Sequence, residues 1–179
     1  MNSKAKHTAL RTSGKLSLAI LVFLLCQSTN VFAADLAQYK KIAEHTIEQA
    51  KSGHINDIDA LIAQQEIMIG IGIKACNEYA TKNPGAKQAL SLVTSNAEGM
   101  KKLSLHDIEE KWHEGGIFKK NGITIDDHFG ELGSLIDAVI HPATSYIALN
   151  HFKSNNDKSH LQQVVAELTE VLAHIAQVK

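Results

Sequence analysis

The sequence predicts an all-α protein, an antiparallel helical bundle of four long helices, one kinked at Pro142, plus one short helix and a small hairpin near 117–125. Two observations predict this class. Apolar residues recur every three or four positions through four long segments, as they do on the buried face of a helix. The connections between these segments are short and contain Gly, Pro or Asn. Short connections bring each helix back beside the preceding one, which favours an antiparallel bundle.

The first two long helices are expected at 35–52 and at about 57–81. Ser52-Gly53 ends the first helix, and Asn56 or Asp57 can cap the second. Residues 67–73 alternate like a strand and include two glycines, each of which costs a helix about 1 kcal/mol relative to alanine. We predict helix there because the period of 3.6 continues on both sides, and the glycines would let a neighbouring helix approach closely.

A third helix is expected at 86–103 and a short fourth helix at 105–114. Ser104 and Asp107 resemble a capping box, with the shorter aspartate in the usual Glu or Gln position. Gly115-Gly116 ends the short helix. Residues 117–125 contain Asn121-Gly122 between apolar residues, so they are either a two-stranded hairpin or an ordered loop, and we favour the hairpin.

A fifth helix is expected to start at Asp126 or Asp127 and to reach the polar turn at 153–158. Its apolar residues keep their phase across Pro142, so we predict one kinked helix in which the proline frees the Ala138 carbonyl. The last helix, about 157–178, carries an apolar seam at coiled-coil spacing. The seam consists of Leu161, Val164, Leu168, Val171, Ile175 and Val178.

Residues 1–33 have the three parts of a secretory signal peptide in order. A basic start without acidic residues precedes an apolar run at 16–26, which spans only about 16 Å as a helix and is too short for a membrane anchor. Val31-Phe32-Ala33 suits signal peptidase, so cleavage is expected between Ala33 and Ala34. The protein is therefore expected to be exported, periplasmic or secreted, with residues 34–179 forming a single helical-bundle domain.

Charge and cysteine content restrict the kinds of partner and of thiol chemistry that the protein can have. Cleavage would leave 14 basic residues, all lysine, against 19 acidic residues, a net charge of −5. An acidic chain without arginine is poorly suited to nucleic acid, so no nucleic-acid partner is expected. Cys76 would be the single cysteine of the exported chain, and we interpret it as a small buried residue, with an intermolecular disulfide or a reactive thiol as the alternatives.

The strongest chemical feature is the short helix at 105–114. His106, Glu109 and His113 project within about 60° of each other, and Glu110-x-x-His113 has the spacing used by di-iron bundles. These four residues are the predicted ligands of a divalent metal, Zn or Fe. A complete di-iron site needs a second such motif, and the sequence offers only Asp157-x-x-His160. The alternative is a row of ordinary salt bridges beside the apolar seam.

Other histidines give weaker candidates. His160, Glu167 and His174 recur every seven residues along one edge of the last helix, a pattern that pairing between helices explains equally well. His141 precedes the proline, and we expect it to be exposed or to serve the carbonyl that the proline frees. The sequence contains no Cys-x-x-Cys-His motif, so covalent haem is excluded. Met68 and Met100, the candidate axial ligands of a non-covalent haem, lie in the core phase.

Catalytic motifs are lacking. The sequence has no Gly-x-Ser-x-Gly motif and no phosphate-binding glycine loop, and Asp126-Asp127-His128 is better explained as a helix cap. The expected function is therefore an exported, non-catalytic module that binds a small ligand, a metal ion or a protein partner. A metal-dependent enzyme, hydrolytic or redox, with its site on the 105–114 helix is the first alternative. A structural or assembly protein is the second.

Overall fold

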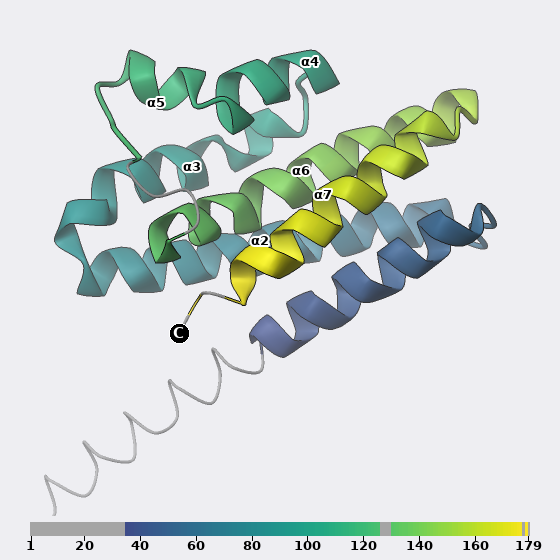
Figure 1. Ribbon diagram of the computed structural model, residues 1–179, viewed down its shortest axis with the longest axis horizontal. Coiled ribbons are helices and arrows are strands. Elements are labelled where there is room, and N and C mark those ends of the chain that lie inside the picture. Colours follow the sequence, from purple (N-terminus) through teal and green to yellow (C-terminus); the bar gives the residue numbers. More distant parts are fainter. Residues whose placement is uncertain (1–34, 126–129, 177, 179) are drawn as a thin grey trace, which may run out of the picture. The chain divides into compact units, whose positions relative to one another are not determined.

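The computed structural model describes residues 35–125, 130–176 and 178. Every regular element among these residues is a helix, which confirms the all-α prediction (Figure 1). After a helix over 35–52, the elements are α2 (Ile58–Lys82), η1 (Pro84–Ala86), α3 (Lys87–Met100), α4 (Leu105–Ile108), η2 (Glu109–His113), α5 (Gly116–Lys120), α6 (Glu131–Asn155) and α7 (Ser159–Ile175). The signal peptide expected at 1–33 lies outside the described residues.

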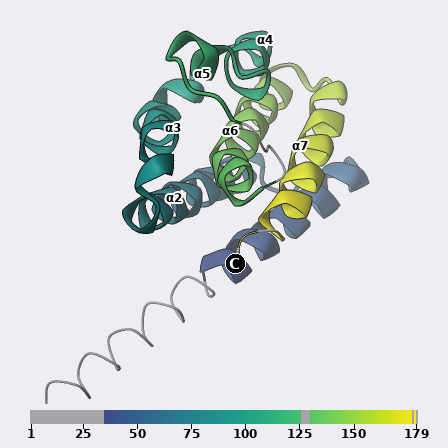
Figure 2. The ribbon, with the colours of Figure 1, turned by 60° about the vertical axis from the view of Figure 1, so that its left-hand side comes forward.

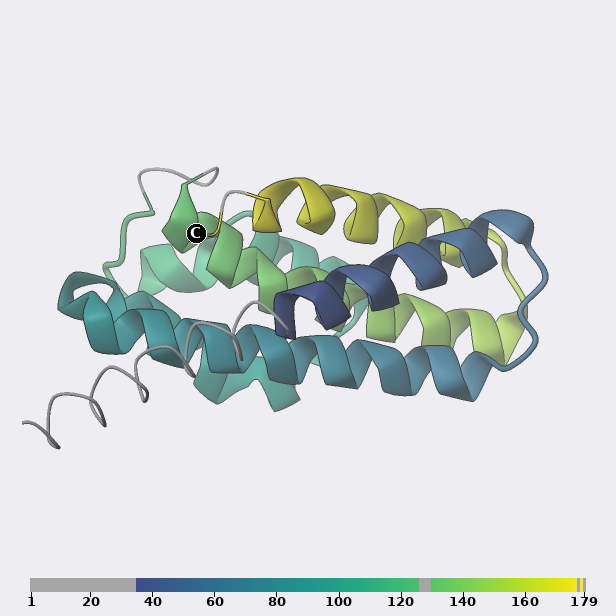
Figure 3. The same cartoon turned by 90° about the horizontal axis from the view of Figure 1, so that it is seen from below.

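The helix α6 is the centre of the bundle. It packs against α2, α3, α4 and α7, and the view in Figure 2 shows it surrounded by them. Figure 3 shows the helix over 35–52 running beside α7. Within the described chain, α6 alone is long and apolar enough to cross a membrane, and 83% of its most apolar window is buried inside the protein. A central core helix has this composition for the same reason as a membrane helix, because apolar side chains surround it.

Most of the predicted apolar seam of α7 packs into this core. Leu161, Val164, Leu168, Val171 and Ile175 are all buried, whereas Val178 lies beyond the end of α7 and is only partly buried. Cys76 is also buried and free, and burial raises the pKa of its thiol to about 12, so it behaves as a small core residue. Met68 and Met100 are likewise buried in the core.

The glycine-containing part of α2 is helical, which confirms the prediction for 67–73. Asp57 caps this helix, since its Oδ1 accepts a hydrogen bond from the Ala60 amide at 2.9 Å. Gly72 lies directly against the Ala138 carbonyl of α6, where a Cβ atom would collide with the backbone. The glycine therefore allows the close approach of α2 to the central helix.

Pro142 lies inside α6 without ending it. A proline has no amide hydrogen, so the Ala138 carbonyl, four residues earlier, loses its helical partner as predicted. Tyr39, fully buried on the first helix, donates its hydroxyl hydrogen to that carbonyl at 3.0 Å. The tyrosine thus satisfies a backbone acceptor that the proline leaves free in the core, and burial raises the pKa of its hydroxyl well above the ordinary value.

The hairpin expected near 117–125 is wrong, because residues Gly116–Lys120 form the helix α5. Gly122 has φ +66° and ends this helix in a Schellman motif, with hydrogen bonds from Ile123 N to Phe118 O (2.9 Å) and from Gly122 N to Lys119 O (3.1 Å). An Asn-Gly pair suits a hairpin turn and a helix end equally well, because both need a positive φ. The predicted caps Asp126 and Asp127 lie outside the described residues.

Candidate metal-binding site

A π-helical turn determines where His113 lies. Ser104 caps α4 by accepting a hydrogen bond from the Asp107 amide at 3.0 Å, as the sequence predicted. The chain then widens into η2, in which the Glu114 amide bonds to the Glu109 carbonyl at 2.9 Å, five residues earlier. This turn holds an extra residue and rotates everything after it relative to an ideal α-helix.

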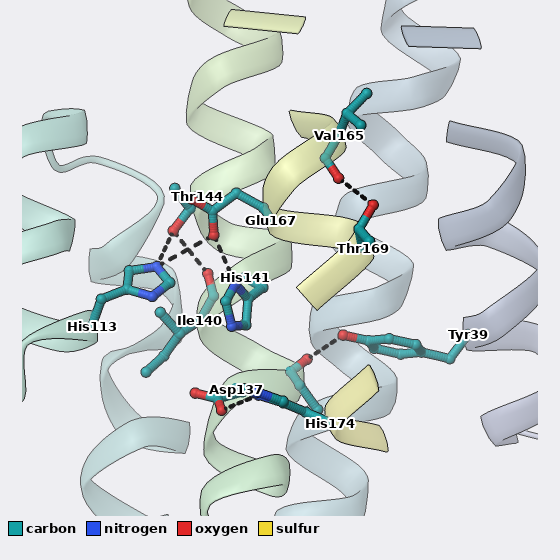
Figure 4. A network of polar contacts seen from close by, with 11 residues as sticks. Tyr39, His113, Asp137, Ile140, His141, Thr144, Val165, Glu167, Thr169 and His174 are labelled. Carbon is teal, nitrogen blue, oxygen red and sulfur yellow. Dashed lines mark hydrogen bonds and ion pairs between the residues drawn. The ribbon is translucent and has the colours of Figure 1, made fainter. Parts of the chain in front are cut away.

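Two aromatic residues fasten this turn onto the protein. Trp112 is 5% exposed and packs edge-on against Phe118, with ring centroids 5.9 Å apart. The side chain of His113, the residue after this buried tryptophan, reaches α6, where its Nε2 lies 3.0 Å from Thr144 Oγ1 (Figure 4). Thr144 donates its own hydrogen to the Ile140 carbonyl at 3.1 Å. The threonine hydroxyl can therefore accept a hydrogen bond from His113 when Nε2 carries the ring proton, and that proton must leave for Nε2 to bind a metal ion.

One of the four predicted metal ligands, His113, belongs to a converging group of ligand atoms. His113 is largely buried, whereas His106, Glu109 and Glu110 are exposed. The groups of described residues whose ligand atoms converge include His113 and none of the other three. The rotation at the π turn explains the difference, because the sequence projection assumed a uniform 100° per residue.

The first converging group consists of His113, His141 and Glu167, one residue each from η2, α6 and α7. One ligand atom of each lies within 4.8 Å of the others. His141 Nδ1 is 2.7 Å from Glu167 Oε2, and His113 Nε2 is 3.5 Å from the same oxygen. The two imidazole rings meet edge to face with centroids 4.8 Å apart.

The second converging group shares His141 and adds Asp137 of α6 and His174 of α7. His174 Nδ1 lies 2.5 Å from Asp137 Oδ2, and the rings of His141 and His174 are 5.8 Å apart. We call the five residues of both groups the histidine cluster. It lies between the central helix, the last helix and the π turn (Figure 4).

The cluster is buried and its groups perturb one another. Burial lowers the pKa of His113, and the charge of Glu167 only partly offsets this. Burial acts the same way on His141, but the hydrogen bond and charge of Glu167 outweigh it and raise the pKa of that ring. Burial raises the pKa of Asp137, and the nearby His141 and His174 lower it by less than burial raises it. The ion pairs of both carboxylates with described residues involve histidines alone.

One expectation needs correction here. His141 was expected to be exposed or to bond to the Ala138 carbonyl, but it is buried in the core, with 2% exposed. The Ala138 carbonyl instead accepts a hydrogen bond from Tyr39. The row along α7 agrees with the alternative of pairing between helices, since Glu167 and His174 pair with residues of α6, and His160 lies beside His151 of α6, with ring centroids 5.2 Å apart.

Asp137 was not among the residues predicted from the sequence. The available signal was spacing, since Asp137 and His141 are four residues apart on one helix and Glu167 and His174 are seven apart on another, which places each pair on one helix face.

The donor set suits a transition metal. Imidazole nitrogen combined with carboxylate oxygen is typical of Zn²⁺ and Fe²⁺ sites, whereas Ca²⁺ and Mg²⁺ prefer oxygen alone.

Comparisons with known protein families, with curated proteins and with solved structures found no match to this chain.

Proposed function

We propose that the protein is an exported binding module that holds a divalent transition-metal ion, Zn²⁺ or Fe²⁺, in the histidine cluster. The observation that carries the proposal is the convergence of His113, His141 and Glu167 from three separate elements, with ligand atoms within 4.8 Å of one another. Side chains from three elements meet at this spacing, and the buried polar residues of the described chain outside the cluster are all uncharged: Thr46, Gln65, Ser134, Thr144 and Ser145.

Charge supports the same proposal. Removing a carboxylate from water is unfavourable unless an opposite charge accompanies it. Glu167 has an 11% exposed side chain and Asp137 a 16% exposed one, and imidazoles are their ion-pair partners in the described chain. Protonation of His141, whose pKa Glu167 raises, compensates one of these charges, and while the imidazoles are neutral both charges lack compensation. A divalent cation would compensate them and would use the imidazoles as ligands.

Metal analysis of the purified protein tests this proposal. After chelation and titration with Zn²⁺, the wild-type protein is expected to bind Zn²⁺ stoichiometrically, and His113→Ala is expected to weaken the binding. His106→Ala is the matched control, because His106 lies on the same short segment but is exposed and outside both converging groups. Equal affinity in the two variants, or no binding in the wild type, would rule the site out.

A metal-dependent enzyme is the second candidate function. Two histidines and one glutamate form a three-ligand set, and catalytic zinc sites combine such a set with an open fourth position. The visible spectrum of the Co²⁺-loaded protein, recorded with and without added azide, tests for that position. A spectral change on adding azide would indicate an exchangeable ligand and favour catalysis. An unchanged spectrum would favour binding alone.

A further inference from the structure

The part of the cluster that the first metal position leaves unused is the pair Asp137 and His174. Both side chains are largely buried, with 16% and 9% exposed, and they face each other between α6 and α7. They lie on the side of the His141 ring away from Glu167 (Figure 4). A buried carboxylate and imidazole at this place have the same ligand chemistry as the first group.

The orientation of His141 connects the two places. Its Nδ1 faces Glu167 at 2.7 Å, within the first group. The two nitrogens of an imidazole ring point in divergent directions, so Nε2 faces away from Glu167. The ring therefore presents one nitrogen to each group of ligands.

We propose that Asp137, His174 and Nε2 of His141 form a second divalent-cation position, so that two metal ions lie on either side of the His141 ring. This inference rests on the proposed function, since it assumes that the first position binds the same kind of ion. His141 is then the ligand common to both positions. His113 and Glu167 complete the first, and Asp137 and His174 complete the second.

The surrounding charge permits a second cation. Besides Asp137 and Glu167, the exposed carboxylates of Glu109 and Glu170 are close enough to act electrostatically on His113 and on His141, respectively. Four carboxylates thus act on the cluster, two of them from the exposed surface, and their negative charge favours cation binding. A neutral His141 keeps one ring proton when the first ion binds. The second ion replaces that proton, which leaves to the solvent.

The Zn²⁺ stoichiometry of the full chain tests the second position. The wild-type protein is expected to bind two ions per chain. His113→Ala and His174→Ala are each expected to lose one ion and to retain the other, whose affinity falls less. His141→Ala is expected to weaken the binding of both ions. Asp137→Asn, which preserves the shape of the side chain, provides a second variant of the second position that disturbs packing little. Circular dichroism confirms that each variant is folded.

Three outcomes separate this inference from the proposed function. No bound ion in the wild type overturns both. One ion in the wild type that His113→Ala removes and Asp137→Asn leaves overturns the second position alone. One ion that Asp137→Asn removes and His113→Ala leaves also overturns the two-ion arrangement and assigns the ion to the other group. Two ions provide a further check with Cu²⁺, because coupling through the shared ring should make the electron paramagnetic resonance signal per ion smaller at two equivalents than at one.

Discussion

Substitution of Gly72 by alanine should destabilise the protein through the contact between α2 and α6. An added Cβ would lie 2.9 Å from the Ala138 carbonyl carbon and 3.0 Å from Val139 Cγ2, and closer still to the Ala138 oxygen. These neighbours cannot simply rotate away, because two belong to the backbone of the central helix. That oxygen also accepts the hydrogen bond from Tyr39. The helices must therefore move apart.

The expected magnitude follows from two opposing effects. Overpacking a well-packed core costs about 1–3 kcal/mol, and a backbone obstacle places this site at the upper end. Replacing glycine by alanine inside a helix returns about 1 kcal/mol. The net loss in the free energy of unfolding is about 2 kcal/mol. For a domain of this size that corresponds to a melting temperature lower by about 4–8 °C.

Gly70→Ala is the matched control, two residues earlier in the same helix. Nothing lies within 4 Å of a Cβ added at Gly70, so the gain in helix propensity should appear undiminished, at up to about 1 kcal/mol of added stability. Thermal and urea unfolding followed by far-ultraviolet circular dichroism measure both variants. If Gly72→Ala were as stable as Gly70→Ala, the close approach of α2 and α6 would be refuted.

Three further predictions concern the core and the site. Tyr39→Phe should cost about 1–3 kcal/mol of unfolding free energy because it leaves the Ala138 carbonyl buried without a donor, and the cost should shrink in a Pro142→Ala background, which restores the helical amide; equal costs in both backgrounds would contradict this. Zn²⁺ affinity measured by calorimetry should fall as the pH is lowered, since histidines must lose protons to bind the ion, and the fall should begin above the ordinary histidine pKa because Glu167 raises the pKa of His141; an affinity independent of pH would argue against histidine ligands. Trp112 fluorescence should change on Zn²⁺ addition in the wild type but not in His113→Ala. An identical response in both proteins would show that Trp112 does not report binding at His113.

Local signals explain why much of the fold could be predicted. The repeating apolar residues of α7 define its buried face whatever it packs against, because the period of 3.6 is a property of the helix alone. The cap at Asp57 and the freed carbonyl at Ala138 follow from neighbours in the sequence. The hairpin was wrongly predicted because Asn121-Gly122 fits both a hairpin turn and a helix end, so the local sequence does not distinguish the two structures.

The sequence by itself determined the helices, their buried faces and the presence of His113 as a candidate ligand. The tertiary structure alone decided which residues His113 meets. The π turn rotates His113 away from the helix face that the sequence assigned to it together with His106. The packing of α6 between α7 and the segment formed by α4 and η2 then brings His113 to His141 and Glu167. These residues are 28 and 54 positions further along the chain. Helical periodicity fixes which side of its own helix a residue occupies, but contacts between helices depend on how they pack, which no local pattern specifies.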